Sequence, residues 1–278
     1  GAAMKEKNLV FATRMGLVKQ VPATADVQID RVTKRLKREN NAVEMNACDC
    51  YAMELALRLR EKYGASVTAF TMGPPQARAV LKSCRALGAE SGYILNDMAF
   101  AGSDTYATAH ILSCAIKADE TENGPFDLIL CGRQSSDGDT AQVGAELAEQ
   151  LGIAQLTAVC DLPEIKGAYI EALIDCDSEQ RLMQASLPAL LTVGRTPYEL
   201  RFASIGGVIE ANRNDTIKTL TKDMLPEIDA AMIGLDGSPT RTADTFVPER
   251  SSAAKFIEGG TTEEAAETLA AMLRRGTV

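Results

Sequence analysis

DLILCGRQSSDGDTAQVGAELAEQL, residues 127–151, indicates the fold class of this chain. It opens with an apolar run typical of a buried strand, over 127–131, and passes through a polar loop with two glycines. It then becomes a helical pattern in which Val143, Leu147 and Leu151 recur at i, i+4 and i+8. Strand, loop and helix in this order are the repeating unit of a parallel α/β sheet. A loop of small residues before a helix N-terminus also presents backbone N–H groups, so it is a candidate cradle for a diphosphate.

The same rhythm extends on both sides of this stretch. Further strands are predicted at 67–72, 92–95, 155–160, 168–174, 181–185 and 189–193. A helix is predicted from near Asp49 to Tyr63, where Gly64 ends it, and two more around Val80 and Ile111. We therefore expect an α/β fold: a mostly parallel, doubly wound, Rossmann-like sheet that binds an adenine nucleotide, with an additional β segment.

The chain divides into three predicted parts. Residues 4–195 form the nucleotide-binding α/β domain, and residues 196–260, poor in periodicity, are interpreted as an extended arm that lies on a partner. Residues 261–276 form a C-terminal helix, because Thr261 and Glu264 fit a capping box and Leu269, Met272 and Leu273 supply an apolar face.

Composition excludes several classes of function. Among 278 residues, 29 Lys and Arg stand against 38 Asp and Glu, and this net charge of −9 disfavours nucleic-acid or anionic-membrane binding. A single His argues against a His-ligated metal centre and a catalytic triad, so we predict no metal site and no catalytic side chain. The seven cysteines are interpreted as reduced thiols, and Lys5, Glu6 and Lys7 interrupt any secretory signal. A cytoplasmic location is therefore expected, with the mitochondrial matrix as the alternative.

The loop after residue 131 has two interpretations from composition alone. It can bind a diphosphate, with Arg133 neutralising charge, or Asp139 or Thr140 can simply cap the helix while Gly138 allows a left-handed turn. The sequence has neither the G-x-G-x-x-G fingerprint nor a P-loop. The residues therefore predict an acidic α/β protein with a nucleotide site and do not specify a reaction.

The chain resembles the beta subunit of electron transfer flavoprotein. The similar motifs are spread over nearly the whole sequence: VKQVP at 18–22, MGPPQ at 72–76, LGA at 87–89, GRQ at 132–134, DGDTAQVG at 137–144, LPA at 187–189 and GSPT at 237–240. The resemblance implies a heterodimer whose alpha subunit binds one FAD while this subunit holds a second nucleotide.

That second nucleotide distinguishes two groups of the family. It is a structural AMP in simple members. In electron-bifurcating members it is an FAD that takes hydride from NADH and passes electrons to ferredoxin or flavodoxin and, through the alpha-subunit FAD, to an acyl-CoA dehydrogenase or similar enzyme. This sequence looks more like the bifurcating group, because small residues such as Gly138, Ala141 and Val143 occupy the 137–144 motif. The motif at residues 102–105 also resembles that of the bifurcating members. AMP remains the alternative, and so does a nucleotide-binding stress or signalling protein with a similar sheet.

The resemblance also implies roles for particular residues. The segment 137–148 should surround the diphosphate, and residues 193–202 should form the loop that docks the partner dehydrogenase. The implied cofactor-binding residues are Leu17, Asn46, Ala47, Cys48, Asp49, Met72, Asp104, Thr105, Arg133, Gln134, Asp137, Gly138, Asp139, Thr140, Ala141, Gln142, Val143 and Gly144. The implied partner-binding residues are Pro197, Tyr198 and Leu200.

Overall fold

The computed structural model describes residues 8–12, 29–30, 35–36, 45–135, 138–241, 243, 257 and 260–274. By internal contacts the chain divides into a unit of residues 1–243 and a second unit of residues 244–278. Two residues of the predicted site, Leu17 and Asp137, lie outside the described residues, so their roles stay predictions.

A parallel sheet forms the centre of the first unit. Its strand order is β7-β11-β6-β1-β4-β5-β12, and all neighbouring pairs along this path are parallel. The strands are β1 (Asn8–Ala12), β4 (Ser66–Met72), β5 (Ser91–Leu95), β6 (Leu128–Gly132), β7 (Ala154–Val159), β11 (Ala189–Val193) and β12 (Ile217–Leu220). The predicted mostly parallel α/β fold is confirmed.

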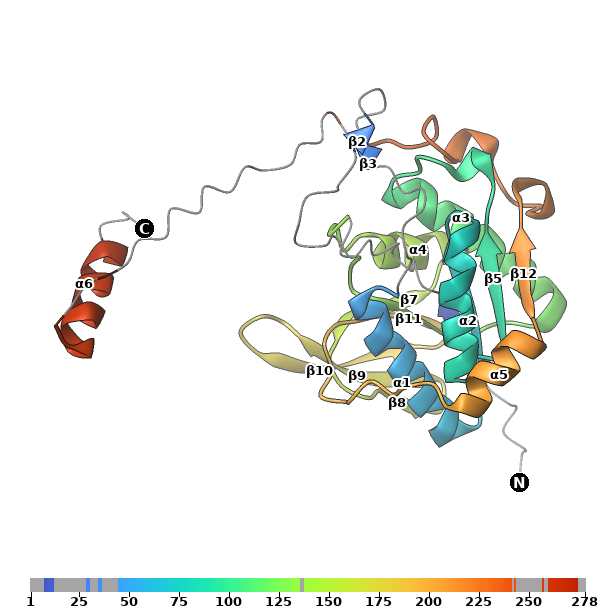
Figure 1. The fold of residues 1–278 in the computed structure, drawn as a ribbon. Coiled ribbons are helices and arrows are strands. Elements are labelled where there is room, and N and C mark those ends of the chain that lie inside the picture. Colours follow the sequence, from blue (N-terminus) through green and yellow to red (C-terminus); the bar gives the residue numbers. More distant parts are fainter. Residues whose placement is uncertain are drawn as a thin grey trace. The chain divides into compact units, whose positions relative to one another are not determined.

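The additional β segment continues this sheet in antiparallel fashion. Strand β9 (Tyr169–Asp175) pairs with β7, and both β10 (Gln180–Ser186) and β8 (Glu164–Lys166) pair with β9. In Figure 1 the β9–β10 hairpin projects away from the helices. A separate short pair consists of β2 (Ile29–Asp30) and β3 (Arg35–Leu36).

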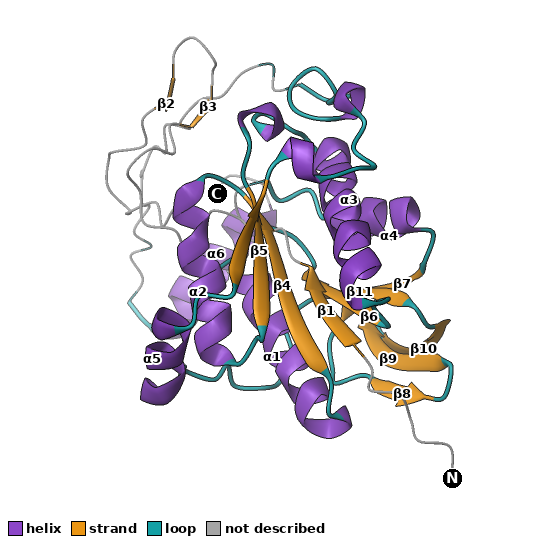
Figure 2. Ribbon diagram, turned by 90° about the vertical axis from the view of Figure 1, so that its right-hand side faces the viewer, coloured by secondary structure: helices purple, strands orange, loops and turns teal. Residues whose placement is uncertain are grey.

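Helices cover both faces of the sheet (Figure 2). One face packs against α1 (Ala47–Tyr63) and α2 (Arg78–Leu87), and the other against α3 (Thr105–Asn123) and α4 (Val143–Leu151). Strand β6 is continuously apolar because both of its faces are buried. Leu128 and Leu130 belong to the core beneath α1 and α2, whereas Ile129 and Cys131 belong to the core beneath α3 and α4. A strand buried on both faces has no polar side to reveal its period.

The region 196–243 contains regular structure that the sequence pattern did not predict. Helix α5 (Ile205–Arg213) packs on α2, and β12 extends the sheet beside β5. The helix is hard to recognise because Gly206 and Gly207 open it, yet a Cβ at Gly207 would lie 2.2 Å from the Ala86 carbonyl oxygen. That close contact with α2 explains why a poor helix former occupies the position. A contact of 196–260 with a partner remains a prediction.

The described part of the second unit contains α6 (Thr262–Arg274). Its predicted capping box is present: the Glu264 N–H donates to Thr261 Oγ1 at 3.2 Å, and the Thr261 N–H donates to Glu264 Oε2 at 3.1 Å. None of the helices in the described part of the chain combines the length and the apolar character needed to span a bilayer.

Candidate functional site

The loop between β6 and α4, residues 133–142, leaves the carboxyl end of the sheet in an irregular conformation. Asp139 and Ala141 have φ values of 49° and 55°, in the left-handed region, whereas Gly138 does not. The Asp139 N–H donates to the Ser135 carbonyl oxygen at 2.8 Å, and the Gln134 side chain donates to the Asp139 carboxylate. A non-glycine residue held in a sparsely populated conformation costs about 1–3 kcal/mol, so the surrounding contacts have to maintain this shape.

The capping interpretation of this loop is wrong. Helix α4 begins at Val143, its N-cap residue is Gln142, and no side chain in the described part of the loop caps it. Neither Asp139 nor Thr140 satisfies the first backbone N–H groups of the helix, and Gly138 does not supply the left-handed turn. The N-terminus of α4 therefore presents N–H groups that have no partner within the helix, as an anion site requires.

A hollow of about 340 Å³, including its open mouth, lies at this place. Its described lining contains one cation, Arg133, and no carboxylate. The described residues that line it are Cys131, Gly132, Arg133, Gln134, Ser135, Thr140, Ala141, Gln142, Val143 and Gly144. The structure thus brings most of the predicted 133–144 set around one cavity, together with Cys131, Gly132 and Ser135, which the prediction did not include. Gly132 could have been predicted as a site residue, because a glycine at the end of a buried strand allows another segment to approach closely.

Two glycines allow the helices to approach the end of β6. A Cβ at Gly132 would lie 2.7 Å from the Asp49 backbone nitrogen and 2.8 Å from its Oδ1. A Cβ at Gly144 would lie 2.5 Å from Thr192 Cγ2 and 2.9 Å from Cys131 Sγ. Real side chains do not tolerate such distances, so both positions require glycine to hold α1 and α4 against the sheet.

The N-terminus of α1 binds the loop through side chains. Asp49, only 2% exposed, accepts a hydrogen bond from the Gly132 N–H at 2.7 Å and one from Asn46 Nδ2 at 3.1 Å. Asn46 Nδ2 also donates to the Gln134 carbonyl oxygen at 2.7 Å. The buried charge of Asp49 is favoured by the helix N-terminus at which it lies. Asn46 and Asp49 thus fix the shape of the hollow, while Ala47 is exposed and Cys48 half-buried beside them.

Asp104 and Thr105 join three segments near the start of α3. Asp104 caps this helix by accepting from the Ala107 N–H at 3.0 Å, and it accepts from the N–H and hydroxyl of Thr240 at 2.8 and 2.7 Å. Burial acts to raise the pKa of Asp104, but these hydrogen bonds outweigh it and the pKa is lowered. The Thr105 hydroxyl donates to Glu146 on α4 at 3.2 Å. Thr105 therefore contacts the helix that begins at the hollow, whereas the carboxylate of Asp104 is used within the chain.

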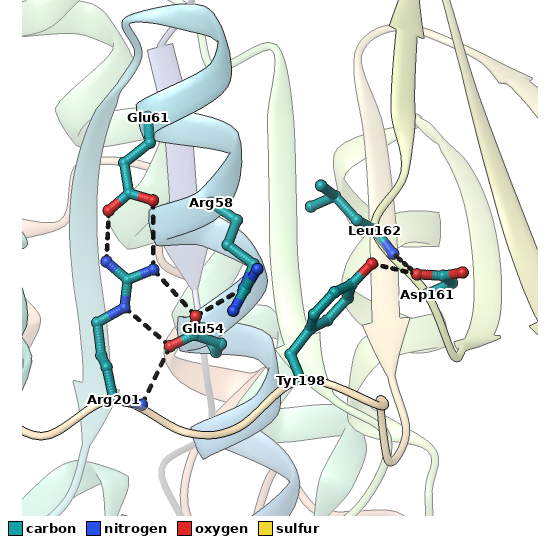
Figure 3. A network of polar contacts seen from close by, with 7 residues as sticks. All are labelled: Glu54, Arg58, Glu61, Asp161, Leu162, Tyr198 and Arg201. Carbon is teal, nitrogen blue, oxygen red and sulfur yellow. Dashed lines mark hydrogen bonds and ion pairs between the residues drawn. The ribbon is translucent and has the colours of Figure 1, made fainter.

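Met72 and the predicted partner-binding residues lie apart from this set. Met72 ends β4, and β1 separates β4 from β6 in the sheet. Tyr198 donates its hydroxyl to Asp161, and the Arg58 guanidinium carbon lies 4.2 Å from its ring centroid (Figure 3), so its side chain is used within the chain. The Asp161 bond and burial raise the pKa of Tyr198. Pro197 and Leu200 are exposed.

Arg201, which the sequence did not single out, is the centre of the polar network in Figure 3. Its guanidinium donates to both oxygens of Glu54, each at 2.9 Å, and to Glu61. Burial acts to raise the pKa of Glu54, but the hydrogen bonds and charge of Arg201 outweigh it and lower the pKa. The partners are 147 residues apart in the sequence, which is why no local pattern revealed them.

The fold and the hollow define an α/β protein with a ligand site at the carboxyl edge of a parallel sheet. The family model for the electron transfer flavoprotein domain matches residues 33–224. Three relatives add detail. The chain is 42% identical to "Electron transfer flavoprotein subunit beta" of Thermoanaerobacterium thermosaccharolyticum over 89% of its own length and 92% of the relative. It is 38% identical to "Protein FixA" of Azotobacter vinelandii over 87% of its own length and 86% of the relative.

The third relative is "Caffeyl-CoA reductase-Etf complex subunit CarD" of Acetobacterium woodii, 36% identical over 92% of this chain and 95% of the relative. The chain therefore belongs to the electron transfer flavoprotein family, and within it to the beta subunits. Membership as a beta subunit implies an alpha subunit as partner.

Proposed function

We propose that this chain is the beta subunit of a bifurcating electron transfer flavoprotein, with FAD as its nucleotide and NADH as electron donor. The observation that carries the proposal is the hollow at the start of α4, where small residues, hydroxyls and Arg133 surround the helix N-terminus. Family membership supports the flavin, and the small residues Gly138, Ala141 and Val143 support the bifurcating group.

The residues present fit a nucleotide diphosphate. The lining offers backbone N–H groups, the Thr140 and Ser135 hydroxyls and one guanidinium, and it contributes no negative charge from the described residues. This lining suits the phosphate end of the adenosine monophosphate part that AMP and FAD share, so AMP remains the alternative.

When bound, the flavin supplies the redox chemistry: it accepts hydride from NADH and yields electrons to ferredoxin or flavodoxin and, through the alpha-subunit FAD, to the dehydrogenase. The residues of this chain bind and orient the nucleotide. Arg133 and the α4 N-terminus neutralise phosphate charge, while Asn46 and Asp49 hold the loop in place through Gln134 and Gly132.

The partners proposed beyond the alpha subunit are an acyl-CoA dehydrogenase-type enzyme and ferredoxin or flavodoxin. The name of the Acetobacterium relative, which joins a caffeyl-CoA reductase and an Etf, supports a CoA-dependent partner. Residues 193–202 would dock that enzyme, and residues 196–260 would contact the alpha subunit. A cytoplasmic location is proposed, since the relatives named above are bacterial.

The deciding experiment identifies the bound nucleotide. The chain is co-purified with its alpha subunit, the nucleotides are extracted, and they are weighed by mass spectrometry. Two FAD per heterodimer and bleaching of the flavin absorbance by NADH would support the bifurcating function. One FAD and one AMP would refute it in favour of the alternative, and ATP bound without any alpha subunit would indicate a nucleotide-binding protein of another class.

A further inference from the structure

The segment between β11 and α5, residues 194–204, combines anchored and exposed side chains. Tyr198 and Arg201 are bonded within the chain, through Asp161 and through Glu54 and Glu61. Between and beyond them, Leu200 is 38% exposed, Phe202 97% and Ile205 83%. These apolar side chains are not buried within their own chain. A group of exposed apolar side chains that the backbone holds in place is typical of a surface that contacts another protein.

The anchor at Arg201 is unusually well defined. Glu54 is 3% exposed, and it receives Arg201 Nε and Nη2 at 2.9 Å each as well as the Arg201 backbone N–H at 3.3 Å. Arg58 Nε donates to the same carboxylate at 2.7 Å. Because the planar guanidinium of Arg201 is bound by two carboxylates of α1, both its orientation and its distance from that helix are fixed.

A second anchor lies three residues further on. The Ser204 hydroxyl oxygen accepts from the Gly207 N–H at 3.0 Å and caps α5. Helix α5 in turn packs so closely on α2 that Gly207 has no room for a side chain. The backbone that carries Phe202 and Ile205 is thus held from both sides, by α1 through Arg201 and by α2 through α5.

We propose that Arg201 and Glu54 are positioning residues: their ion pair holds the segment 194–204 in the conformation that presents Leu200, Phe202 and Ile205 to the dehydrogenase partner. This inference rests on the docking role given to the segment under the proposed function. Preorganised side chains bind more tightly because less conformational freedom is lost on association. Without the pair, the same apolar groups remain but have to be ordered by the partner.

The test compares variants of the heterodimer with an acyl-CoA dehydrogenase from the same organism as electron acceptor. Arg201→Gln should raise the KM for the dehydrogenase about tenfold, equivalent to about 1.4 kcal/mol. The kcat at saturating dehydrogenase, the NADH-dependent reduction of an artificial dye and the flavin content should stay unchanged. A residue with only a structural role would lower these quantities together. Arg201→Lys, which keeps the charge and loses the fork, should give an intermediate KM.

Matched variants keep the outcome clear. Arg60→Gln is the matched control, because it removes one cation and one ion pair, with Glu90, from α1 at a site away from residues 194–204. Its KM for the dehydrogenase should equal that of wild type. The double variant Glu54→Gln, Arg201→Gln avoids an under-paired buried carboxylate, so it should show the raised KM even where Arg201→Gln alone folds poorly. Phe202→Ser tests the contact itself.

Three results separate the inference from the function beneath it. A raised KM in Phe202→Ser and in both Arg201→Gln variants supports the proposal. A raised KM in Phe202→Ser with a wild-type KM in the Arg201→Gln variants overturns the positioning role alone. A wild-type KM in Phe202→Ser overturns the docking role and the inference together, while leaving nucleotide binding to be judged by mass spectrometry.

Discussion

The β6–α4 loop and the β11–α5 segment are both irregular connections that leave the carboxyl end of the sheet, and they are held by different means. The first is fixed largely by glycines that permit close packing and by hydrogen bonds to backbone groups, as between Asp49 and Gly132. The second is fixed by ion pairs between side chains, as between Arg201 and Glu54. Close packing at a glycine does not depend on pH, whereas an ion pair weakens when its carboxylate is protonated. The β6–α4 loop is therefore held by packing in addition to the Asp49 carboxylate, and the β11–α5 segment depends mainly on carboxylate–guanidinium pairs.

The largest expected effect is at the glycine that ends β6. Gly132→Ala would place Cβ against the backbone of Asp49, which cannot move without shifting α1. We expect a loss of about 3 kcal/mol or more in the free energy of unfolding, measured by urea denaturation, because overpacking and disruption of the Asp49 bond combine. A loss below about 1 kcal/mol would show that the cradle adapts and that rigidity is not what distinguishes it.

A smaller loss is expected at the ion pair. Arg201→Gln leaves the buried Glu54 with Arg58 as its remaining ion-pair partner among the described residues, and the side chain that is removed is itself 31% exposed. We expect a loss of about 1–2 kcal/mol in the free energy of unfolding, less than the 3–5 kcal/mol typical of a fully buried pair. The double variant with Glu54→Gln should recover part of the loss. If the double variant is less stable than the single one, desolvation of Glu54 is not the cause.

Acid should loosen the β11–α5 segment. The pKa of Glu54 is below its ordinary value of 4.5, and hydrogen bonding to Arg201 likewise lowers the pKa of Glu61. A lowered folded-state pKa means that the stabilisation is present above about pH 4.5 and is lost as the pH falls through the folded value. Hydrogen exchange of residues 194–204 should therefore rise on going from pH 6 to pH 4, after correction for the intrinsic rate. The double variant should show a weaker rise, and an equal rise would assign the effect to other carboxylates.

The smallest effect on stability is expected at Gly138. Among the described residues, a Cβ at Gly138 meets nothing closer than Ser135 Oγ at 3.6 Å, and its backbone is outside the left-handed region. Gly138→Ala should therefore change the free energy of unfolding by less than about 0.5 kcal/mol. A bulkier Gly138→Leu should reduce the nucleotide content of the heterodimer while the unfolding curve stays near that of wild type. Unchanged nucleotide content in Gly138→Leu would refute the placement of the site at this loop.

The local features of the chain were predictable. Apolar runs gave strands close to their observed bounds, Gly64 ends α1 with φ at 68°, and the Thr261–Glu264 capping box is present. Each of these depends on residues a few positions apart. The short strand β12 and the glycine-opened helix α5 escaped prediction because their stability comes from β5 and α2, to which the local sequence gives no clue.

The sequence by itself determined the α/β class and the position of the β6–α4 loop, because the strand and helix periods and the strand–loop–helix order depend on neighbouring residues. Only the tertiary structure decided what holds the cradle and the neighbouring segments. Asp49 and Gly132 are 83 residues apart, Asp104 and Thr240 are 136 apart, and Glu54 and Arg201 are 147 apart. These pairs meet because the strand order places distant connections at one edge of the sheet, and the pairing of strands is a property of the folded core.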